Sequence, residues 1–64
     1  MKFSVPKMNC GHCRAAITKA VIGLDPSAQV AVDLPSRTVE VGTGRSPGEV
    51  QAAIREAGYE SAPA

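Results

Sequence analysis

The chain has 64 residues, which is enough for one domain and too short for a second hydrophobic core. It contains one Phe, one Tyr and no Trp, so small aliphatic side chains must fill the core and few remain to line an enclosed substrate pocket. The net charge of +1 argues against a nucleic-acid partner. The charged residues before residue 25 are all basic, namely Lys2, Lys7, Arg14 and Lys19.

The opening residues Met1–Pro6 are not followed by an apolar run of signal-peptide or membrane-spanning length. We therefore expect a cytoplasmic protein with no direct membrane insertion. Thiols are kept reduced in that compartment, so two neighbouring cysteines are expected to be metal ligands or redox groups, not a structural disulfide.

Residues 2–7 alternate between apolar and polar, with Phe3 and Val5 on one face, and this predicts a short, half-buried strand. Pro6 places that strand at an edge or near its end. From about Cys13 the apolar residues recur at helical spacing, which predicts a helix that Gly23 and Pro26 end.

Two further alternating runs, at residues 28–34 and 38–41, flank a turn at residues 35–37. Their valines share one face of each run, which predicts an antiparallel hairpin with that face toward the core. The inward residues of the second run are Val39 and Val41.

Residues 46–49 predict the start of a second helix. Ser46 can cap its first turn, Pro47 suits the first helical position, and Glu49 completes a capping box. Gly58 is expected to end this helix. Residues 59–62 are expected to form a short last strand that Pro63 stops.

The predicted order is strand, helix, strand, strand, helix, strand. This is the split βαβ, or ferredoxin-like, arrangement of an α+β sandwich. It implies a four-stranded antiparallel sheet with two helices on one face and the core between them. Residues 1–64 are expected to form this single domain.

The chemistry is concentrated in the segment Met8–Cys13, which reads Met-Asn-Cys-Gly-His-Cys and holds both cysteines and the only histidine. Cys10 and Cys13 lie where the first strand gives way to the first helix. The helix N-terminus favours a thiolate there, most of all at Cys13, and the cations of Lys7 and Arg14 add to this effect.

Two thiolates with no harder ligand nearby suit Cu(I), which accepts two ligands, and also Hg(II), Ag(I) and Au(I). Zn(II) requires four ligands, and this chain offers two thiolates and one imidazole. A zinc site would need a second molecule or water to complete it.

Met8–Cys13 resembles the M-x-C-x-x-C signature of heavy-metal-associated domains, which include bacterial copper chaperones and the N-terminal metal-binding domains of copper P-type ATPases. The resemblance covers essentially the whole chain. Val30–Leu34 resembles the family's V-x-V-D-L strand and Thr38–Val41 its partner strand, and Ala53–Tyr59 resembles the A-I-x-x-A-G-Y stretch. Ala16, Ile17 and Ala20 match the helix that follows the motif.

The resemblance implies that Cys10 and Cys13 ligate Cu(I), while Met8 turns inward and supports the loop. Tyr59 matches a position where bacterial members carry an aromatic hydroxyl close to the metal loop. His12 is a less usual residue between the cysteines. Three roles remain open for it: lowering the thiol pKa values, acting as a weak third ligand, or facing solvent.

The function implied by the resemblance is that of a copper chaperone and not of an enzyme. The chain would deliver Cu(I) by ligand exchange to the metal-binding domains of a copper-transporting P-type ATPase, and would dock through its basic face near Lys7 and Arg14. Exposed thiolates can also bridge two copies, so a copper-bridged homodimer is a further expectation.

Two other functions would also use this pair of cysteines. A thiol–disulfide oxidoreductase would share the C-x-x-C spacing, but its usual alternating βαβ fold is not the one predicted here. A carrier of mercury, zinc or cadmium, or a domain cut from a larger transporter, would keep the fold and change the metal. The lack of acidic residues near the motif argues against zinc and cadmium.

Overall fold

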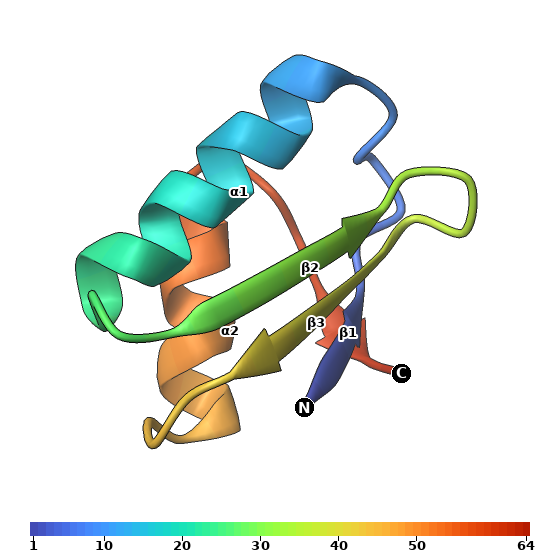
Figure 1. Ribbon diagram of the computed structural model, residues 1–64. Coiled ribbons are helices and arrows are strands. Elements are labelled where there is room, and N and C mark those ends of the chain that lie inside the picture. The colour runs from blue at the N-terminus through green and yellow to red at the C-terminus, as the bar shows by residue number, and fades with distance from the viewer.

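A computed structural model describes all residues 1–64 as one four-stranded antiparallel sheet and two helices (Figure 1). The strands lie in the order β2-β3-β1-β4. The predicted ferredoxin-like α+β fold is therefore confirmed. The elements in chain order are β1 (Lys2–Ser4), α1 (Gly11–Leu24), β2 (Gln29–Asp33), β3 (Thr38–Gly42), α2 (Pro47–Glu56) and β4 (Ala62–Pro63). Neither helix has the length and apolar character needed to cross a membrane.

The hydrophobic core lies between the sheet and the helices, which pack against each other and against one face of the sheet. The inward-facing strand residues are in register, since Phe3 pairs with Val39 and Val41 pairs with Val30. Small aliphatic side chains dominate this core, as the composition predicts. The fully buried side chains are Phe3, Val5, Met8, Ile17, Val21, Val39, Val41, Val50 and Ile54.

Helix α1 begins slightly earlier than its apolar pattern predicts, and its last residue, Leu24, lies between the two predicted stops, Gly23 and Pro26. Its first residue is Gly11, with Cys10 as the N-cap in extended conformation. It continues through Gly23, and the backbone N–H of Asp25 still donates to the carbonyl of Val21 at 2.9 Å. Pro26 then ends the hydrogen-bond ladder because proline has no backbone N–H.

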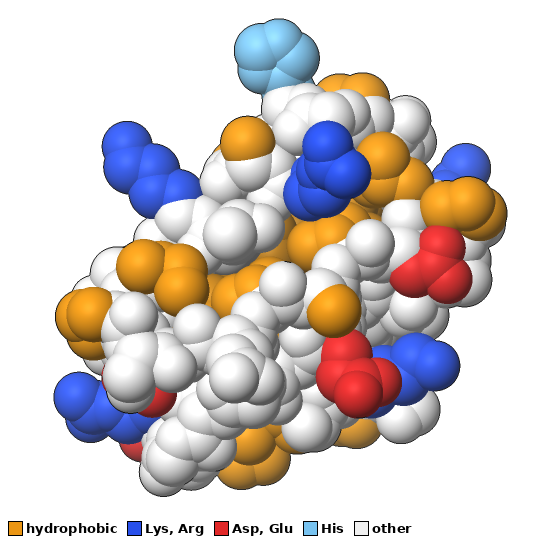
Figure 2. Space-filling model, viewed as in Figure 1, with side chains coloured by type: hydrophobic (Ala, Val, Ile, Leu, Met, Phe, Trp, Pro, Cys, Tyr) orange, Lys and Arg blue, Asp and Glu red, His pale blue; other side chains and the backbone are white.

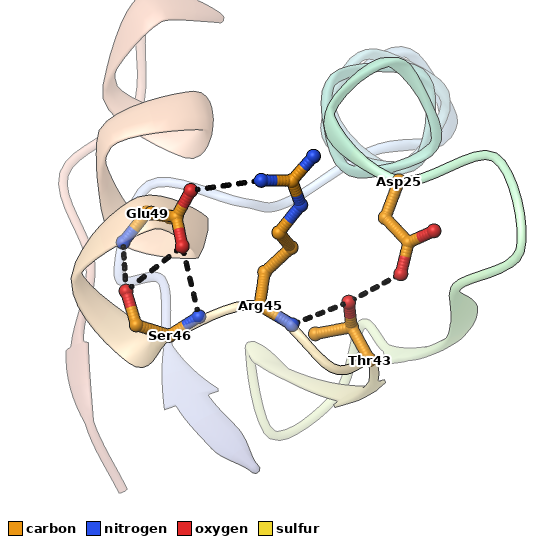
Figure 3. A network of polar contacts seen from close by, with 5 residues as sticks. All are labelled: Asp25, Thr43, Arg45, Ser46 and Glu49. Atoms are coloured by element: carbon orange, nitrogen blue, oxygen red, sulfur yellow. Dashed lines mark hydrogen bonds and ion pairs between the residues drawn. The ribbon is translucent and has the colours of Figure 1, made fainter.

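Helix α2 begins with the predicted capping box (Figure 3). The Ser46 hydroxyl accepts from the backbone N–H of Glu49 at 3.2 Å, and the Glu49 carboxylate accepts from the backbone N–H of Ser46 at 3.2 Å. Gly58 follows the end of this helix with a φ of 98°, in the left-handed region where a side chain would be strained. Its predicted place as the helix stop is confirmed.

Both terminal strands are shorter than predicted, and the prediction for Pro63 was wrong. Strand β4 lies at Ala62–Pro63, so Tyr59 precedes it in a loop, and Pro63 pairs with Phe3. Strand β4 has β1 as its only neighbour in the sheet. A proline is tolerated on such an edge strand because its nitrogen can face outward, where no N–H is needed.

The end of the molecule where α1 stops and α2 starts is held by a chain of polar contacts (Figure 3). The Thr43 hydroxyl donates to the Asp25 carboxylate at 2.6 Å and accepts from the backbone N–H of Arg45 at 3.1 Å. Arg45 in turn forms an ion pair with Glu49 at 3.4 Å. These contacts tie the C-terminus of α1 to the loop between β3 and α2.

Candidate metal centre

The two cysteines lie at the opposite end of α1 from this polar network. Cys10 is exposed at the N-cap, whereas Cys13, in the first turn, is only 7% exposed. Their Sγ atoms are 3.3 Å apart, and both thiols are free. A disulfide would bring the sulfurs to about 2.05 Å. The structure therefore presents two adjacent thiols, one open to solvent and one held against the protein.

The sulfur of Cys13 is surrounded by the loop that leads into the helix. It lies 3.9 Å from the backbone carbonyl oxygen of Lys7 and 3.9 Å from the side-chain Oδ1 of Asn9. Asparagine is a common turn residue, and the sequence alone indicates no further role for Asn9. Its proximity to Cys13 is a feature of the site that sequence reasoning missed, although its place inside the motif was the available signal.

Hydrogen bonds lower the pKa of Cys13 from its ordinary value of 9.0 to about 7. The largest cause is a hydrogen bond from the Tyr59 hydroxyl, followed by hydrogen bonds from the Asn9 backbone and from Cys10. The same contact with Cys13 raises the pKa of Tyr59, and burial adds to that increase. A thiolate at Cys13 is thus favoured near neutral pH.

This electrostatic arrangement differs from the one expected at the sequence level. The cations of Lys7 and Arg14 are not among the causes of the lowered Cys13 pKa, which comes from hydrogen bonds. The structure does bring Tyr59 to the metal loop from the far end of the chain. A hydroxyl donor near the sulfur acts more strongly than cations on solvated side chains, whose field water screens.

Met8 is fully buried and belongs to the hydrophobic core. Its backbone N–H donates to the carbonyl of Val5 at 3.0 Å, which closes a tight turn before the cysteines. Its thioether packs against apolar side chains and fixes the loop to the core. The inward orientation implied by the resemblance is what the structure shows.

His12 is exposed, and the histidine side chain stands clear of the body of the molecule in Figure 2. No three side chains of His, Cys, Asp or Glu converge on one point, so the structure does not bring His12 to the cysteine pair. Of its three open roles, exposure to solvent is the one this arrangement displays.

Lys7 and Arg14 are both exposed, and neither forms an ion pair. On the face shown in Figure 2, the side chains closest to the histidine include Lys or Arg and no acid, while the acidic side chains lie further down the molecule. Lys7 and Arg14 therefore place positive charge close to the cysteines in the chain, and no ion pair neutralises it.

Comparison with known proteins identifies relatives of this fold and motif. The family profile of the heavy-metal-associated domain matches residues 2–60. The copper chaperone Atx1 from Synechocystis PCC6803, in its Cu2 form, is 35% identical with a TM-score of 0.94, and the match covers 97% of this chain and 98% of that one. Among curated proteins, none matches the chain by sequence.

Two further solved structures extend the comparison. A gold-binding protein is 34% identical with a TM-score of 0.92, over 95% of this chain and 94% of that one. The CopZ metallochaperone is 26% identical with a TM-score of 0.87, over 97% of each chain. The profile match spans nearly the whole sequence and the structural matches are equally complete. The chain therefore belongs to the heavy-metal-associated domain family and has the fold of the Atx1 and CopZ copper chaperones.

Proposed function

We propose that this protein is a copper chaperone that binds one Cu(I) ion between Cys10 and Cys13. The observation that carries the proposal is the pair of free thiols 3.3 Å apart, with the pKa of Cys13 lowered to about 7. Metal ligation requires the thiolate, and a pKa near neutrality reduces the cost of deprotonation. The Atx1 and CopZ relatives are metallochaperones, which are not a class of enzyme.

The ligand set supports Cu(I) over harder ions. Two sulfurs converge without a third His, Cys, Asp or Glu side chain, which suits an ion that accepts two soft ligands. Zn(II) would lack two of its usual four ligands. The relative that binds gold is consistent with a site whose selectivity rests on soft sulfur ligands.

The unequal exposure of the two thiols supports delivery by ligand exchange. Cys10 is open to an incoming molecule, whereas Cys13 is held against Tyr59 and the loop. A thiolate of the recipient can bond to Cu(I) before one cysteine lets go, so the ion passes through a three-coordinate state. The recipient we propose is a metal-binding domain of a copper-transporting P-type ATPase, docked on the positive surface near Lys7 and Arg14.

The exposed Cys10 thiol also supports a copper-bridged homodimer, in which a second copy supplies the additional thiolate. A variant of Synechocystis Atx1 is known in a trimeric Cu1 form; it is 37% identical with a TM-score of 0.95, over 97% of this chain and 98% of that one. We also propose a cytoplasmic location, because thiols are kept reduced in that compartment and both cysteines would stay available to a metal ion.

A competition titration against a Cu(I) chelator, followed by native mass spectrometry, tests the proposal. The wild-type protein should retain one Cu(I) per chain, and the double variant Cys10→Ser/Cys13→Ser should retain none. His12→Ala is the matched control, since the structure keeps that side chain apart from the cysteines, and it should still hold one Cu(I). Equal retention by the wild-type protein and the double variant would overturn the proposal.

The same experiment separates copper from other soft or borderline metals. Wild-type protein offered Cu(I) and Zn(II) together should carry only Cu(I) in the mass spectrum. Preferential loading with Zn(II) would assign the chain to a different cargo on the same fold.

A further inference from the structure

The turn between β2 and β3, residues 34–37, lies beside the chain segment that leads from β1 into the metal loop (Figure 1). One residue of this turn, Arg37, makes the contact by accepting one hydrogen bond and donating another. The backbone carbonyl of Arg37 accepts from the N–H of Val5 at 2.8 Å. Its guanidinium Nη1 donates to the carbonyl of Pro6 at 3.1 Å. Arg37 thus holds two successive residues that are far from it in sequence.

Arg37 is also the one residue other than glycine with a positive φ, which is 56°. A glycine would adopt this left-handed conformation without strain, so the turn alone gives no reason for a long charged side chain here. The contribution of that side chain is the bond to Pro6, whose carbonyl receives no backbone N–H. An arginine at this strained position, where a glycine would be relaxed, points to a role for the Arg37 side chain beyond the turn.

The segment that Arg37 holds is directly connected to the cysteine site. Pro6 precedes Lys7, whose carbonyl oxygen lies 3.9 Å from the sulfur of Cys13. The next residue, Met8, closes the turn back to Val5 through a 3.0 Å hydrogen bond. A shift of the Pro6 carbonyl would therefore move the backbone that packs against Cys13.

We propose that Arg37 is a positioning residue of the metal loop, acting through the hydrogen bond from its guanidinium to the Pro6 carbonyl. This bond restrains the turn at residues 5–8 and so holds the loop closed around Cys13. The restraint slows release of a bound ion without any contact between Arg37 and the ion. The part that concerns the ion rests on the proposed function, whereas the restraint on the loop exists in the metal-free protein.

The decisive variant is Arg37→Gly, which removes the guanidinium and suits the left-handed backbone. Arg37→Lys keeps a cationic donor at this position. Lys2→Gln is the matched charge control, because Lys2 is an exposed cation in β1, at the N-terminal end of the molecule (Figure 1). Three quantities are measured: amide hydrogen exchange at Met8 without metal, the rate of Cu(I) release to a chelator, and the melting temperature.

Arg37→Gly should speed exchange at the Met8 amide about tenfold and Cu(I) release about fivefold, as expected for loss of one charge-assisted hydrogen bond. The melting temperature should not fall, because glycine removes the backbone strain. Faster exchange and faster Cu(I) release without a lower melting temperature would distinguish loop positioning from a general loss of stability. Arg37→Lys should recover part of both effects, and Lys2→Gln should match the wild-type protein.

The inference is wrong if Arg37→Gly leaves exchange at Met8 and Cu(I) release unchanged. It is also wrong if all amides of the protein exchange faster together, since that reports global destabilisation. If the glycine variant does not fold, Arg37→Asn gives the same comparison, because asparagine also tolerates the left-handed region. Failure of the wild-type protein to bind Cu(I) would overturn the proposed function, while the exchange result would still decide the role of Arg37.

Discussion

Helix α2 begins with a side-chain cap, and helix α1 begins without one. At α2, Ser46 and Glu49 satisfy each other's backbone N–H groups, and these contacts lower the pKa of the Glu49 carboxyl. At α1, the N-cap is Cys10, no side chain caps the first turn, and that turn contains no acidic residue. The two N-termini share the same unpaired N–H groups and partial positive charge, so the difference lies only in what is placed there.

One helix start is therefore used for stability, and the other is available for chemistry. A capping box at α1 would bring a carboxylate and a hydroxyl to the positive helix end. The two sulfurs occupy that end instead, and the lowered pKa of Cys13 favours a thiolate there near neutral pH. The positive surface around Lys7 and Arg14 belongs to the same uncapped end of the molecule.

The largest expected change comes from removing the hydroxyl that favours this thiolate. Tyr59→Phe should raise the pKa of Cys13 from about 7 toward its ordinary 9.0, without reaching it, because the hydrogen bonds from Asn9 and Cys10 remain. Since the folded-state pKa rises, the thiolate fraction at neutral pH falls and Cu(I) binding becomes more dependent on pH between these values. Thiolate absorbance in the ultraviolet, recorded against pH for the wild-type protein and for Tyr59→Phe, both with Cys10 present, measures the shift. An unchanged titration would show that Tyr59 does not act on Cys13.

Breaking the cap of α2 should affect stability and leave the metal site intact. Ser46→Ala should lower the free energy of unfolding by about 1 kcal/mol, because the Glu49 N–H loses its acceptor and the Glu49 carboxylate loses its ordered position. Urea denaturation of the metal-free protein measures the loss. Cu(I) affinity should be unaltered, since Ser46 lies at the opposite end of the molecule. A parallel loss of Cu(I) affinity would mean that the two helix starts are coupled.

The smallest effect is expected from giving α1 the cap that it lacks. Cys10→Ser places a favoured N-cap residue where the backbone is already extended, so the metal-free protein should gain about 0.5 kcal/mol in unfolding free energy. Cys13→Ser is the control, since that position lies inside the helix and is buried. Urea denaturation compares the two variants. Destabilisation by Cys10→Ser would contradict the inference that α1 lacks the stabilising contribution of a side-chain cap.

The order of the elements was predictable for two reasons. The apolar residues recur at the spacing of a strand or of a helix, and residues that cap or end a helix mark the boundaries. Ser46, Pro47 and Glu49 predicted the start of α2, and Gly58 its stop. The sequence pattern predicts the last strand too early, because it treats Pro63 as the residue that stops the strand. A proline is excluded only where its nitrogen must pair, and that depends on which strands are neighbours.

The candidate site could be predicted only in part. The spacing of Cys10 and Cys13 and their place at a helix start can be read directly from the chain. The hydrogen bond from Tyr59 could be expected only through the family resemblance. No feature of the sequence predicted the hydrogen bond from Arg37 to Pro6. It joins two loops that the pairing of β1 with β3 brings together.

The sequence by itself determined the fold class, the position of the cysteine pair and the absence of an acidic first turn in α1. These properties depend on patterns among residues that are close together in the sequence. Only the tertiary structure decided which thiol is exposed, why the pKa of Cys13 is lowered and what holds the loop before it. Those properties depend on groups distant in sequence, Tyr59 and Arg37, whose approach is set by packing of the strands and helices around one core.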